Sequence, residues 1–273
     1  MLDQGKMLIA IDLDGTTLQS DGRTISDYTK KVFHAVEAAG HVIVIATGRP
    51  YRMSIGTYEA LNLTSPMVTF NGALTSHPLE KDWPHRHARY IDRNFVFDLL
   101  RHQQTFDLEF VAAEYRRKFF LNNFQAADPH IFGLDNFEPY HRLRPDLLTE
   151  DPHAMLLSTR AKDKISIQNE IEEHFNREVT VSAWGGPNGI LEIVPRGVNK
   201  AYGLKYILED LQISRSQLIA FGDEYNDIEM FQLAQTGYAV KNASVRLIGH
   251  ADEILPWTND EDAVARKLEE LLL

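Results

Sequence analysis

The sequence predicts an α/β protein whose core is a Rossmann-like, doubly wound parallel sheet, with a second α/β domain inserted into it. Short apolar runs alternate with amphipathic segments up to about residue 82 and again from about residue 190, which is typical of such a sheet. Between these parts the chain is rich in aromatic residues, and its expected strands are not followed by loops of glycine and acidic residues. We therefore expect a core formed by 1–82 and 190–273, and an inserted α/β domain at 83–189.

The first part of the core shows the alternation clearly. Continuous apolar runs predict parallel strands buried on both faces at Met7–Ile11, Val42–Ala46 and Met67–Phe70. Between the first two runs, Ser26 is suited to cap a helix that reaches Ala39 and stops at Gly40. Pro50 favours the first turn of a second helix, because proline lacks the amide hydrogen that this position leaves unpaired.

The pattern resumes in the last part of the chain. Strands are expected at Ile190–Val194, Leu218–Phe221, Gly237–Val240 and Asp252–Leu255. Asn199 is a candidate cap for a helix that runs to Leu211, and Ala263–Leu272 predicts a closing amphipathic helix.

The insert predicts a smaller α/β unit. A helix is expected at Arg93–Gln104, a hairpin at Glu109–Ala112 and Lys118–Leu121, and a second unit at Met155–Ser182. Gly185–Gly189 is expected to be a turn that, with Trp184, helps to shape the ligand pocket. Five histidines of this part lack the spacing of a metal site, and most of them are expected at the surface; they are His85, His87, His130, His141 and His153.

Composition excludes several classes of protein. The chain contains no cysteine, which rules out disulfides, zinc–thiolate sites and thiol catalysis. Its net charge of -11 argues against a nucleic-acid or anionic-membrane surface, because phosphate backbones require clustered Lys and Arg. No apolar run approaches the roughly 20 residues that span a bilayer, and the first residues do not resemble a secretory signal. We expect a cytoplasmic protein that binds neither nucleic acid nor membranes.

Polar clusters follow the predicted core strands. Asp12 and Asp14 come after the first strand, Thr47 and Arg49 after the second, and Asn71 after the third. A further acidic cluster, Asp223 to Asp227, follows the strand at Leu218–Phe221. Because the carboxyl ends of parallel strands share one edge of a sheet, these loops should meet there.

Such a set of side chains favours phosphoryl transfer. Several carboxylates at one edge repel one another unless a cation lies between them, and an all-oxygen set suits Mg²⁺. Asp12 is then a candidate nucleophile and Asp14 a candidate general acid and base. Gly15 lets the backbone bend around a phosphoryl group, while the Thr47 hydroxyl and the Lys200 charge suit its oxygens.

These residues resemble the motifs of a known family. Asp12-Leu-Asp-Gly-Thr16 is similar to the signature of the phosphatase branch of the haloacid dehalogenase-like hydrolase superfamily. Thr47, Lys200 and Gly222-Asp-Glu-Tyr-Asn-Asp227 resemble its second, third and fourth motifs, in the same order. The position of the insert is similar to that of a type-two cap. Ala46-Thr-Gly-Arg49 and Gly197-Val-Asn-Lys200 resemble the Cof-type sugar phosphatases.

The resemblance implies a role for each matching residue. Asp12 would be the nucleophile and Asp14 the acid/base, with Mg²⁺ held by the Asp12 carboxylate, the Asp14 main-chain oxygen and Asp223. Asp227 would support the metal site. The residues implied around the phosphate or the leaving group are Leu13, Thr47, Gly48, Arg49, Asn71, Lys200 and Asn226.

We expect a phosphatase for small phosphorylated metabolites, such as sugar phosphates or phosphorylated cofactors. Three other functions stay open: a phosphomutase of the same superfamily, a signalling module with an aspartate phospho-acceptor, and a regulatory protein that binds its ligand without catalysis. Three residues also have structural alternatives. Arg49 can pair with a surface carboxylate, Asn71 can belong to a tight turn with Gly72, and Asp227 can orient backbone amides.

Overall fold

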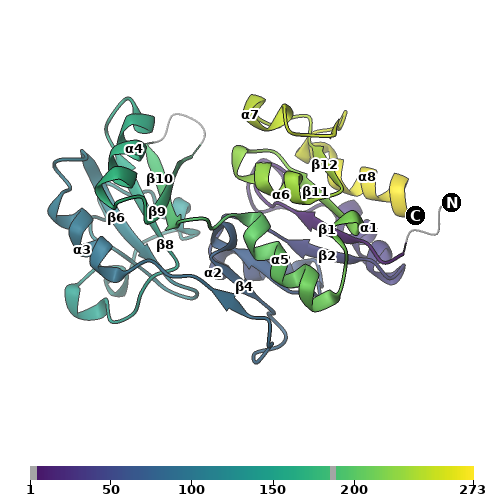
Figure 1. Cartoon of the computed structure of the whole chain (residues 1–273), viewed down its shortest axis with the longest axis horizontal. Helices are drawn as coiled ribbons and strands as arrows, with labels where there is room; N and C mark the ends of the chain where they lie inside the picture. Colours follow the sequence, from purple (N-terminus) through teal and green to yellow (C-terminus); the bar gives the residue numbers. More distant parts are fainter. Residues whose placement is uncertain (1–4, 185–188) are drawn as a thin grey trace. The chain divides into compact units, whose positions relative to one another are not determined.

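A computed structural model describes residues 5–184 and 189–273 (Figure 1). The chain divides into two compact units. The first contains Met1–Arg49, Ser54–His87 and Asn199–Leu273, and the second contains Pro50–Met53 and Ala88–Val198. Except for its last residue, the turn expected at Gly185–Gly189 lies outside the described residues.

The first unit is built on a parallel sheet with the strand order β13-β12-β11-β1-β2. Its strands are β1 (Leu8–Ile11), β2 (Val42–Ile45), β11 (Leu218–Gly222), β12 (Thr236–Ala239) and β13 (Glu253–Ile254). In β1, which lies between β11 and β2, all residues are buried, as its continuous apolar sequence predicts. Ile11 at its end is in register with Phe221 of β11 and Ile45 of β2, so the loops after these strands begin at the same edge.

The third expected strand, β3 (Met67–Thr69), lies beside β2 through a parallel bridge between Ala46 and Val68. It also belongs to a smaller sheet of order β3-β4-β5, with β4 at Leu74–Ser76 and β5 at His87–Ala88. A tight turn over Phe70–Gly72 reverses the chain between β3 and β4, with Asn71 in the left-handed region at φ 50°.

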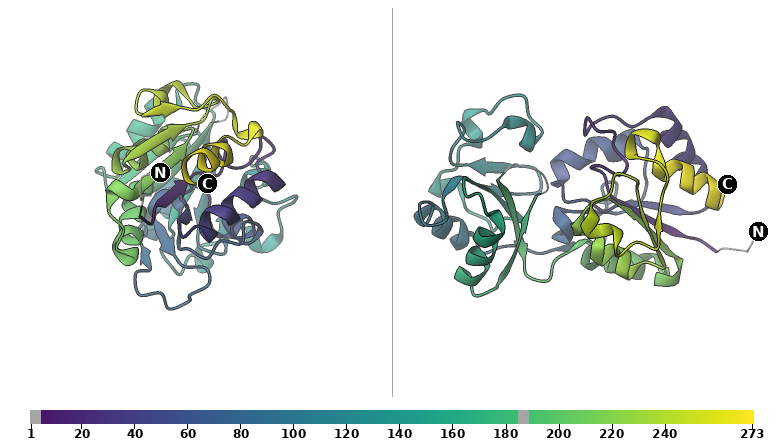
Figure 2. Two further views of the ribbon diagram at one scale, coloured as in Figure 1. Left: turned by 90° about the vertical axis from the view of Figure 1, so that its right-hand side faces the viewer. Right: turned by 90° about the horizontal axis from the view of Figure 1, so that it is seen from above.

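The helices of the first unit begin where their capping residues predict. The Ser26 side chain accepts a hydrogen bond from the Thr29 amide at the start of α1 (Asp27–Ala38), and the Asn199 side chain accepts one from Tyr202 at the start of α5 (Lys200–Leu211). The remaining helices of this unit are α6 (Ile228–Leu233), α7 (Val245–Ile248) and α8 (Ala263–Leu272). The helix α2 (Tyr51–Ala60) begins directly after Pro50; its first three residues belong to the second unit and the rest to the first. The closing helix α8 packs beside α1 (Figures 1 and 2).

The second unit contains an antiparallel sheet of order β7-β6-β8-β10-β9. Its strands are β6 (Leu108–Glu114), β7 (Phe119–Leu121), β8 (Ala154–Thr159), β9 (Val179–Ala183) and β10 (Ile190–Pro195). The hairpin expected from the sequence is confirmed as the pair β6–β7. The assignment of Ile190–Val194 to the parallel core is wrong, because this strand pairs antiparallel with β8 and β9. An apolar run shows that a strand is buried, but it does not specify the neighbouring strand.

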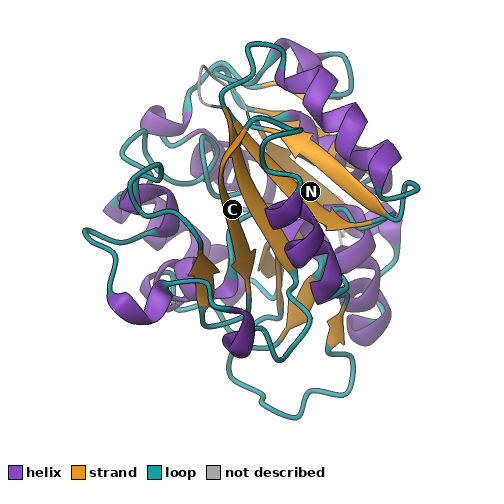
Figure 3. Ribbon diagram, turned by 90° about the vertical axis from the view of Figure 1, so that its left-hand side faces the viewer, coloured by secondary structure: helices purple, strands orange, loops and turns teal. Residues whose placement is uncertain are grey.

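Two helices cover one face of this antiparallel sheet (Figures 1 and 3). They are α3 (Arg93–Arg101), which is shorter than expected, and α4 (Lys164–His174). Aromatic residues such as Phe110, Phe119 and Phe132 form a separate cluster that includes the other face of β6.

Short 3-10 turns connect these elements at Phe70–Gly72, Pro129–Phe132, Pro139–His141, Pro145–Leu147, Arg215–Gln217, Tyr225–Asp227 and Asn259–Glu261. Of the five histidines for which a surface position was mostly expected, His141 and His153 are buried, with 9% and 4% of their surface exposed. The His141 ring stacks on Phe119 and the His153 ring on Tyr90, so aromatic packing accounts for their burial.

Within the described residues, none of the helices combines the length and the apolar character that crossing a membrane requires.

Candidate active site

Carboxylates far apart in the sequence meet at the carboxyl edge of the parallel sheet. Asp12 directly follows β1, and its amide donates a hydrogen bond of 3.0 Å to the Phe221 carbonyl of β11. Asp223 directly follows β11. Together with Asp227, these residues each offer a carboxylate oxygen, and the three oxygens lie within 4.8 Å of one another. The convergence expected from the sequence is therefore present.

Lys200 lies between two of these carboxylates. Its Nζ donates hydrogen bonds of 2.6 Å to Asp12 Oδ1 and 2.7 Å to Asp227 Oδ1. The side chain is completely buried at the start of α5, where the helix dipole disfavours a positive charge. Two ionic partners offset both the dipole and the burial, so Lys200 serves to join the first and last acidic loops.

Asp227 organises the loop after β11. Its Oδ2 accepts hydrogen bonds from the backbone amides of Asp223 and Glu224, at 3.0 and 3.1 Å, while Oδ1 accepts from Lys200. A side chain at Gly222 would overlap the Asp227 carboxyl group. This geometry favours the structural alternative for Asp227, in which its carboxylate orients backbone amides.

Asp223 is held against the loop after β1. Thr16 Oγ1 donates a hydrogen bond of 2.9 Å to Asp223 Oδ1. Gly15 has φ +70°, and a Cβ atom there would overlap Asp223 Oδ2. Glycine is therefore needed at this position for both its conformation and its size. Thr16 is not among the site residues expected from the sequence, although a hydroxyl at the end of the Asp12–Thr16 motif is a usable signal for it.

The clustered carboxylates of Asp12, Asp223 and Asp227 carry more negative charge than Lys200 can balance. Burial raises the pKa of Asp12 to about 7, although the Lys200 charge opposes the shift. Burial also raises the pKa of Asp223 to about 8, with further contributions from the charges of Asp12 and Asp227. For Lys200, burial lowers the pKa, but the two adjacent carboxylates outweigh burial and raise it. One lysine does not neutralise three carboxylates, and their all-oxygen donor set fits a hard divalent cation.

Asp14 and Arg49 form a pair beside this group. Arg49 Nε donates a hydrogen bond of 2.6 Å to Asp14 Oδ2, and its Nη2 contacts Asp14 Oδ1. The same Nη2 donates to the Gly22 carbonyl at 2.7 Å. The Asp14 side chain is 55% exposed and is not one of the three clustered carboxylates. The alternative in which Arg49 pairs with a carboxylate is thus the observed arrangement, and its partner is the candidate acid/base.

The loops after β2, β3 and β11 are linked by hydrogen bonds. Thr47 Oγ1 accepts from the Arg49 amide at 3.1 Å, and the Thr47 carbonyl accepts from the Asn71 amide at 3.1 Å. Asn226 Nδ2 donates to Asn71 Oδ1 at 3.0 Å. A Cβ atom at Gly48 would lie 3.2 Å from Asn71 Nδ2. Asn71 therefore forms the expected turn and also connects the second and fourth motifs.

Leu13 has a different position from the polar residues. Its side chain is completely buried, and its carbonyl accepts hydrogen bonds from the amides of Thr17 and Leu18, at 3.0 and 2.8 Å. Any contribution of Leu13 to a ligand is therefore made by its main-chain amide.

Two asparagines that are not among the site residues expected from the sequence hold the loop after β1 in place. Asn242 Nδ2 donates a hydrogen bond of 2.7 Å to the Gly15 carbonyl, and Asn259 Nδ2 donates one of 2.9 Å to the Leu18 carbonyl. The Asn259 amide also donates to Asn242 Oδ1 at 3.0 Å. Asn242 follows the strand β12, so its place after a core strand was the available signal.

Known proteins resemble the chain over nearly its whole length. A family model for haloacid dehalogenase-like hydrolases matches residues 9–268. The 5-amino-6-(5-phospho-D-ribitylamino)uracil phosphatase YitU of Bacillus subtilis (strain 168) is 34% identical over 268 residues, which are 96% of this chain and 96% of the relative. YcsE of the same organism, a phosphatase for the same compound by its name, is 31% identical over 274 residues. These are 97% of this chain and 96% of the relative.

Solved structures agree with this assignment. A haloacid dehalogenase-like hydrolase from Bacteroides thetaiotaomicron has a TM-score of 0.81 at 26% identity, covering 98% of this chain and 100% of its own. The sugar phosphatase BT4131, of subclass IIB, shares the fold with a TM-score of 0.79 at 19% identity. The match covers 97% of this chain and 98% of BT4131. The resemblance drawn from the sequence motifs and the predicted Rossmann-like fold are both confirmed. The chain belongs to the haloacid dehalogenase-like hydrolase family and is one of its phosphatases.

Proposed function

We propose that the protein is a Mg²⁺-dependent phosphatase that hydrolyses small phosphorylated metabolites through a phosphoryl group carried on Asp12. The observation that supports this most strongly is the buried group in which Lys200 contacts both Asp12 and Asp227 while Asp223 lies alongside. A buried, oriented carboxylate next to a cation site is suited to attack phosphorus. An ordinary surface acidic cluster would not be buried around a lysine in this way.

The metal would be held by the Asp12 and Asp223 carboxylates and the Asp14 main-chain oxygen, with Asp227 supporting the loop. Bound Mg²⁺ supplies positive charge that lets a phosphate anion approach these carboxylates. Asp227 already has hydrogen bonds at both oxygens, which supports a role for it in the outer shell.

Residues of the chain can carry out two phosphoryl transfers, first from the ester to Asp12 and then from Asp12 to water. In the first, an Asp12 oxygen forms a bond to phosphorus, the phosphorus–oxygen bond of the ester breaks, and Asp14 gives a proton to the departing oxygen. In the second, Asp14 takes a proton from water, the water oxygen bonds to phosphorus, and Asp12 is regenerated as inorganic phosphate leaves. Both Asp14 oxygens accept from Arg49 in this structure, so Asp14 leaves this ion pair before it carries the proton that it gives to the departing oxygen. Lys200 fixes the orientation of Asp12.

Thr47, Gly48, Asn226 and the Leu13 amide would surround the phosphate, and Asn71 would keep the loops in place. The names of the two relatives suggest which substrate to test first. Because both are phosphatases for a phosphorylated ribityl-amino-uracil, we propose that a phosphorylated polyol or sugar attached to a heterocycle belongs to the substrate class here.

A screen of phosphorylated metabolites tests the proposal. The purified protein is incubated with 5-amino-6-(5-phospho-D-ribitylamino)uracil, sugar phosphates and phosphorylated cofactors, with Mg²⁺ or with chelator, and phosphate release is measured. We expect release that requires Mg²⁺ and is abolished in Asp12→Asn while the fold is kept.

The other outcomes separate the alternative functions. An isomeric phosphate ester in place of free phosphate would identify a phosphomutase, and a stable phosphoprotein without turnover would identify a signalling module. Ligand binding without any reaction would point to a regulatory protein. Normal turnover by Asp12→Asn would remove Asp12 from the role of nucleophile.

A further inference from the structure

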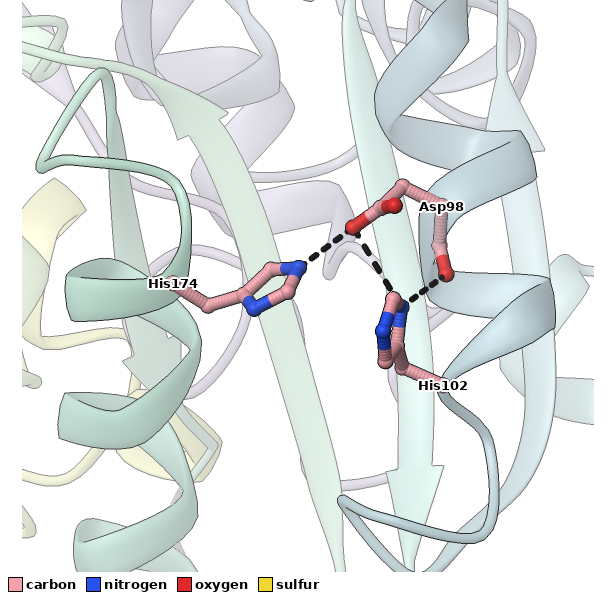
Figure 4. Close-up of side chains that lie close together, drawn as sticks. All are labelled: Asp98, His102 and His174. Atoms are coloured by element: carbon pink, nitrogen blue, oxygen red, sulfur yellow. Dashed lines mark hydrogen bonds and ion pairs between the residues drawn. The ribbon is translucent and has the colours of Figure 1, made fainter.

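A group of metal-ligating side chains lies in the second unit, apart from the carboxylates described above. Asp98 belongs to α3, His102 is the residue that caps the end of α3, and His174 is the last residue of α4. Figure 4 shows the three side chains pointing toward one another. Each offers one ligand atom, and these atoms lie within 4.8 Å of one another. We propose that they form a binding site for a divalent transition-metal ion, with Zn²⁺ as the ion to test.

One nitrogen of each histidine already lies close to Asp98 Oδ2. His174 Nε2 is hydrogen-bonded to Asp98 Oδ2, and His102 Nδ1 lies 3.5 Å from the same oxygen. Asp98 and His102 are four residues apart, which places them on one face of the helix end. Ligand distances of about 2.0–2.2 Å around Zn²⁺ put neighbouring donors roughly 3–4 Å apart. His102 Nδ1 also forms a hydrogen bond of 3.0 Å with the Asp98 main-chain carbonyl. Binding of an ion therefore replaces the proton between His174 and Asp98 and requires the His102 ring to turn away from that carbonyl.

Aromatic packing restrains both imidazole rings. The His174 ring meets Phe106 and Phe175 edge-on, with centroid distances of 5.3 and 5.1 Å, and the His102 ring lies 6.3 Å from Phe106. Phe106 and Phe175 are themselves buried. Rings held in this way lose less freedom when they bind an ion, which favours affinity.

The carboxylate is also oriented by a partner outside the group. Arg101 Nη2 donates a hydrogen bond of 2.8 Å to Asp98 Oδ1 and leaves Oδ2 directed at the histidines. Such an outer-shell hydrogen bond is usual for metal-binding carboxylates. The Arg101 charge weakens the attraction for a cation, but the ends of two helices oppose it. Carbonyl groups at the carboxyl ends of α3 and α4 give this position a partial negative charge.

The donor set selects the kind of ion. Two imidazole nitrogens and one carboxylate oxygen suit Zn²⁺, Ni²⁺ or Cu²⁺, whereas Mg²⁺ prefers oxygen ligands alone. The side chains are partly exposed, so an ion can enter from solvent and water can complete its coordination. The expected effect is to link α3 to α4 and to stabilise the second unit. This inference does not depend on the proposed phosphatase mechanism.

A Zn²⁺ titration of the full, metal-stripped chain in saturating Mg²⁺ tests the proposal. Isothermal calorimetry should show a Zn²⁺ site that Mg²⁺ does not displace. In the double variant His102→Gln and His174→Gln, the affinity should fall by at least about tenfold. His130→Gln, an exposed histidine of the same unit, is the matched control and should bind as the unchanged protein does. Asp223→Asn should also keep this site, since it alters only the carboxylate group of the first unit.

Equal Zn²⁺ affinity in the double variant and the unchanged protein would overturn the proposal, as would loss of the site in Asp223→Asn. If the double variant does not fold, X-ray absorption at the zinc edge of the unchanged protein decides the question. Two imidazole ligands in that spectrum support the site, and ligation by oxygen atoms alone rejects it. Absence of Zn²⁺ binding would leave the group as a set of hydrogen bonds between two helix ends.

Discussion

Lys200 illustrates how much a single residue decides in this site. It is completely buried and pairs with two buried carboxylates from different loops. Removing one member of a buried ionic group leaves the others without compensation, which costs far more than losing a surface pair. The same contacts orient Asp12, so one substitution should affect both stability and catalysis.

We predict that Lys200→Met lowers the free energy of unfolding by about 3–5 kcal/mol in chelator, because Asp12 and Asp227 lose their shared partner. Turnover should fall by roughly 100-fold or more. Urea unfolding and phosphate release measure the two effects. Lys205→Met, an exposed lysine on the same helix, is the control and should change neither quantity appreciably. Similar stability of the two variants would contradict the assigned role of Lys200.

A second prediction at this scale concerns Gly15. A methyl group there would overlap Asp223 Oδ2, so Gly15→Ala should displace that carboxylate and raise the Mg²⁺ concentration needed for half-maximal activity. Gly40 has φ +96° and open space around it, so Gly40→Ala incurs a backbone penalty of about 1–2 kcal/mol without touching the site. Activity measured against Mg²⁺ concentration should separate the variants. An unchanged Mg²⁺ requirement in Gly15→Ala would show that the two loops can move apart freely.

At the scale of elements, packing decides what a helical glycine does. Gly56 in α2 is exposed, with no atom within 4 Å of the position that an added methyl group would take, whereas Gly203 in α5 faces Val68 and Thr75. A Cβ at Gly203 would lie 2.6 Å from Val68 Cγ1 and 2.9 Å from Thr75 Oγ1. The close approach of α5 to β3 and β4 therefore depends on the small residue, and this packing places Lys200 at the site.

We predict opposite effects for two otherwise identical substitutions. Gly56→Ala should stabilise the protein by about 0.5–1 kcal/mol, because alanine favours a helix and meets no neighbour. Gly203→Ala should destabilise it by about 1–3 kcal/mol through overpacking. Urea unfolding of both variants checks this, with each serving as the other's control. The same sign for both changes would mean that helix propensity outweighs packing at Gly203.

At the scale of the whole molecule, the carboxylate group couples stability to pH and metal. Burial raises the pKa of Asp12 to about 7 and that of Asp223 to about 8, well above the values of an unfolded chain. A raised pKa contributes stability that is fully present below the unfolded value and is lost as the pH rises through the folded value. The metal-free protein should therefore lose stability between about pH 4 and 8.

The resulting prediction concerns thermal unfolding at pH 5.5 and 8.5. In chelator, Tm should be lower at pH 8.5, by about 2–4 °C for each kcal/mol lost. Mg²⁺ should raise Tm more at pH 8.5, since it binds the ionised carboxylates and only the folded state. Asp223→Asn should reduce both the pH effect and the Mg²⁺ effect. An equal Mg²⁺ effect at both pH values would show that metal binding is not coupled to these groups.

The sequence by itself determined most local structure and the members of the carboxylate group. Strand β1, the caps Ser26 and Asn199, and the loops carrying Asp12 and Asp223 were all predictable. Apolar periodicity and capping depend on residues close in the chain, and the parallel-sheet rule brings the strand ends to one edge. The family motifs then supplied the expected chemistry.

The tertiary structure alone decided which elements became neighbours. It placed β10 in the antiparallel sheet, paired Arg49 with Asp14, and brought His174 to Asp98 and His102. Nothing local distinguishes these outcomes, because the partner of a buried strand, a loop arginine or a helix-end histidine lies at a distant position in the chain. Contacts of that kind follow from how whole elements pack against one another.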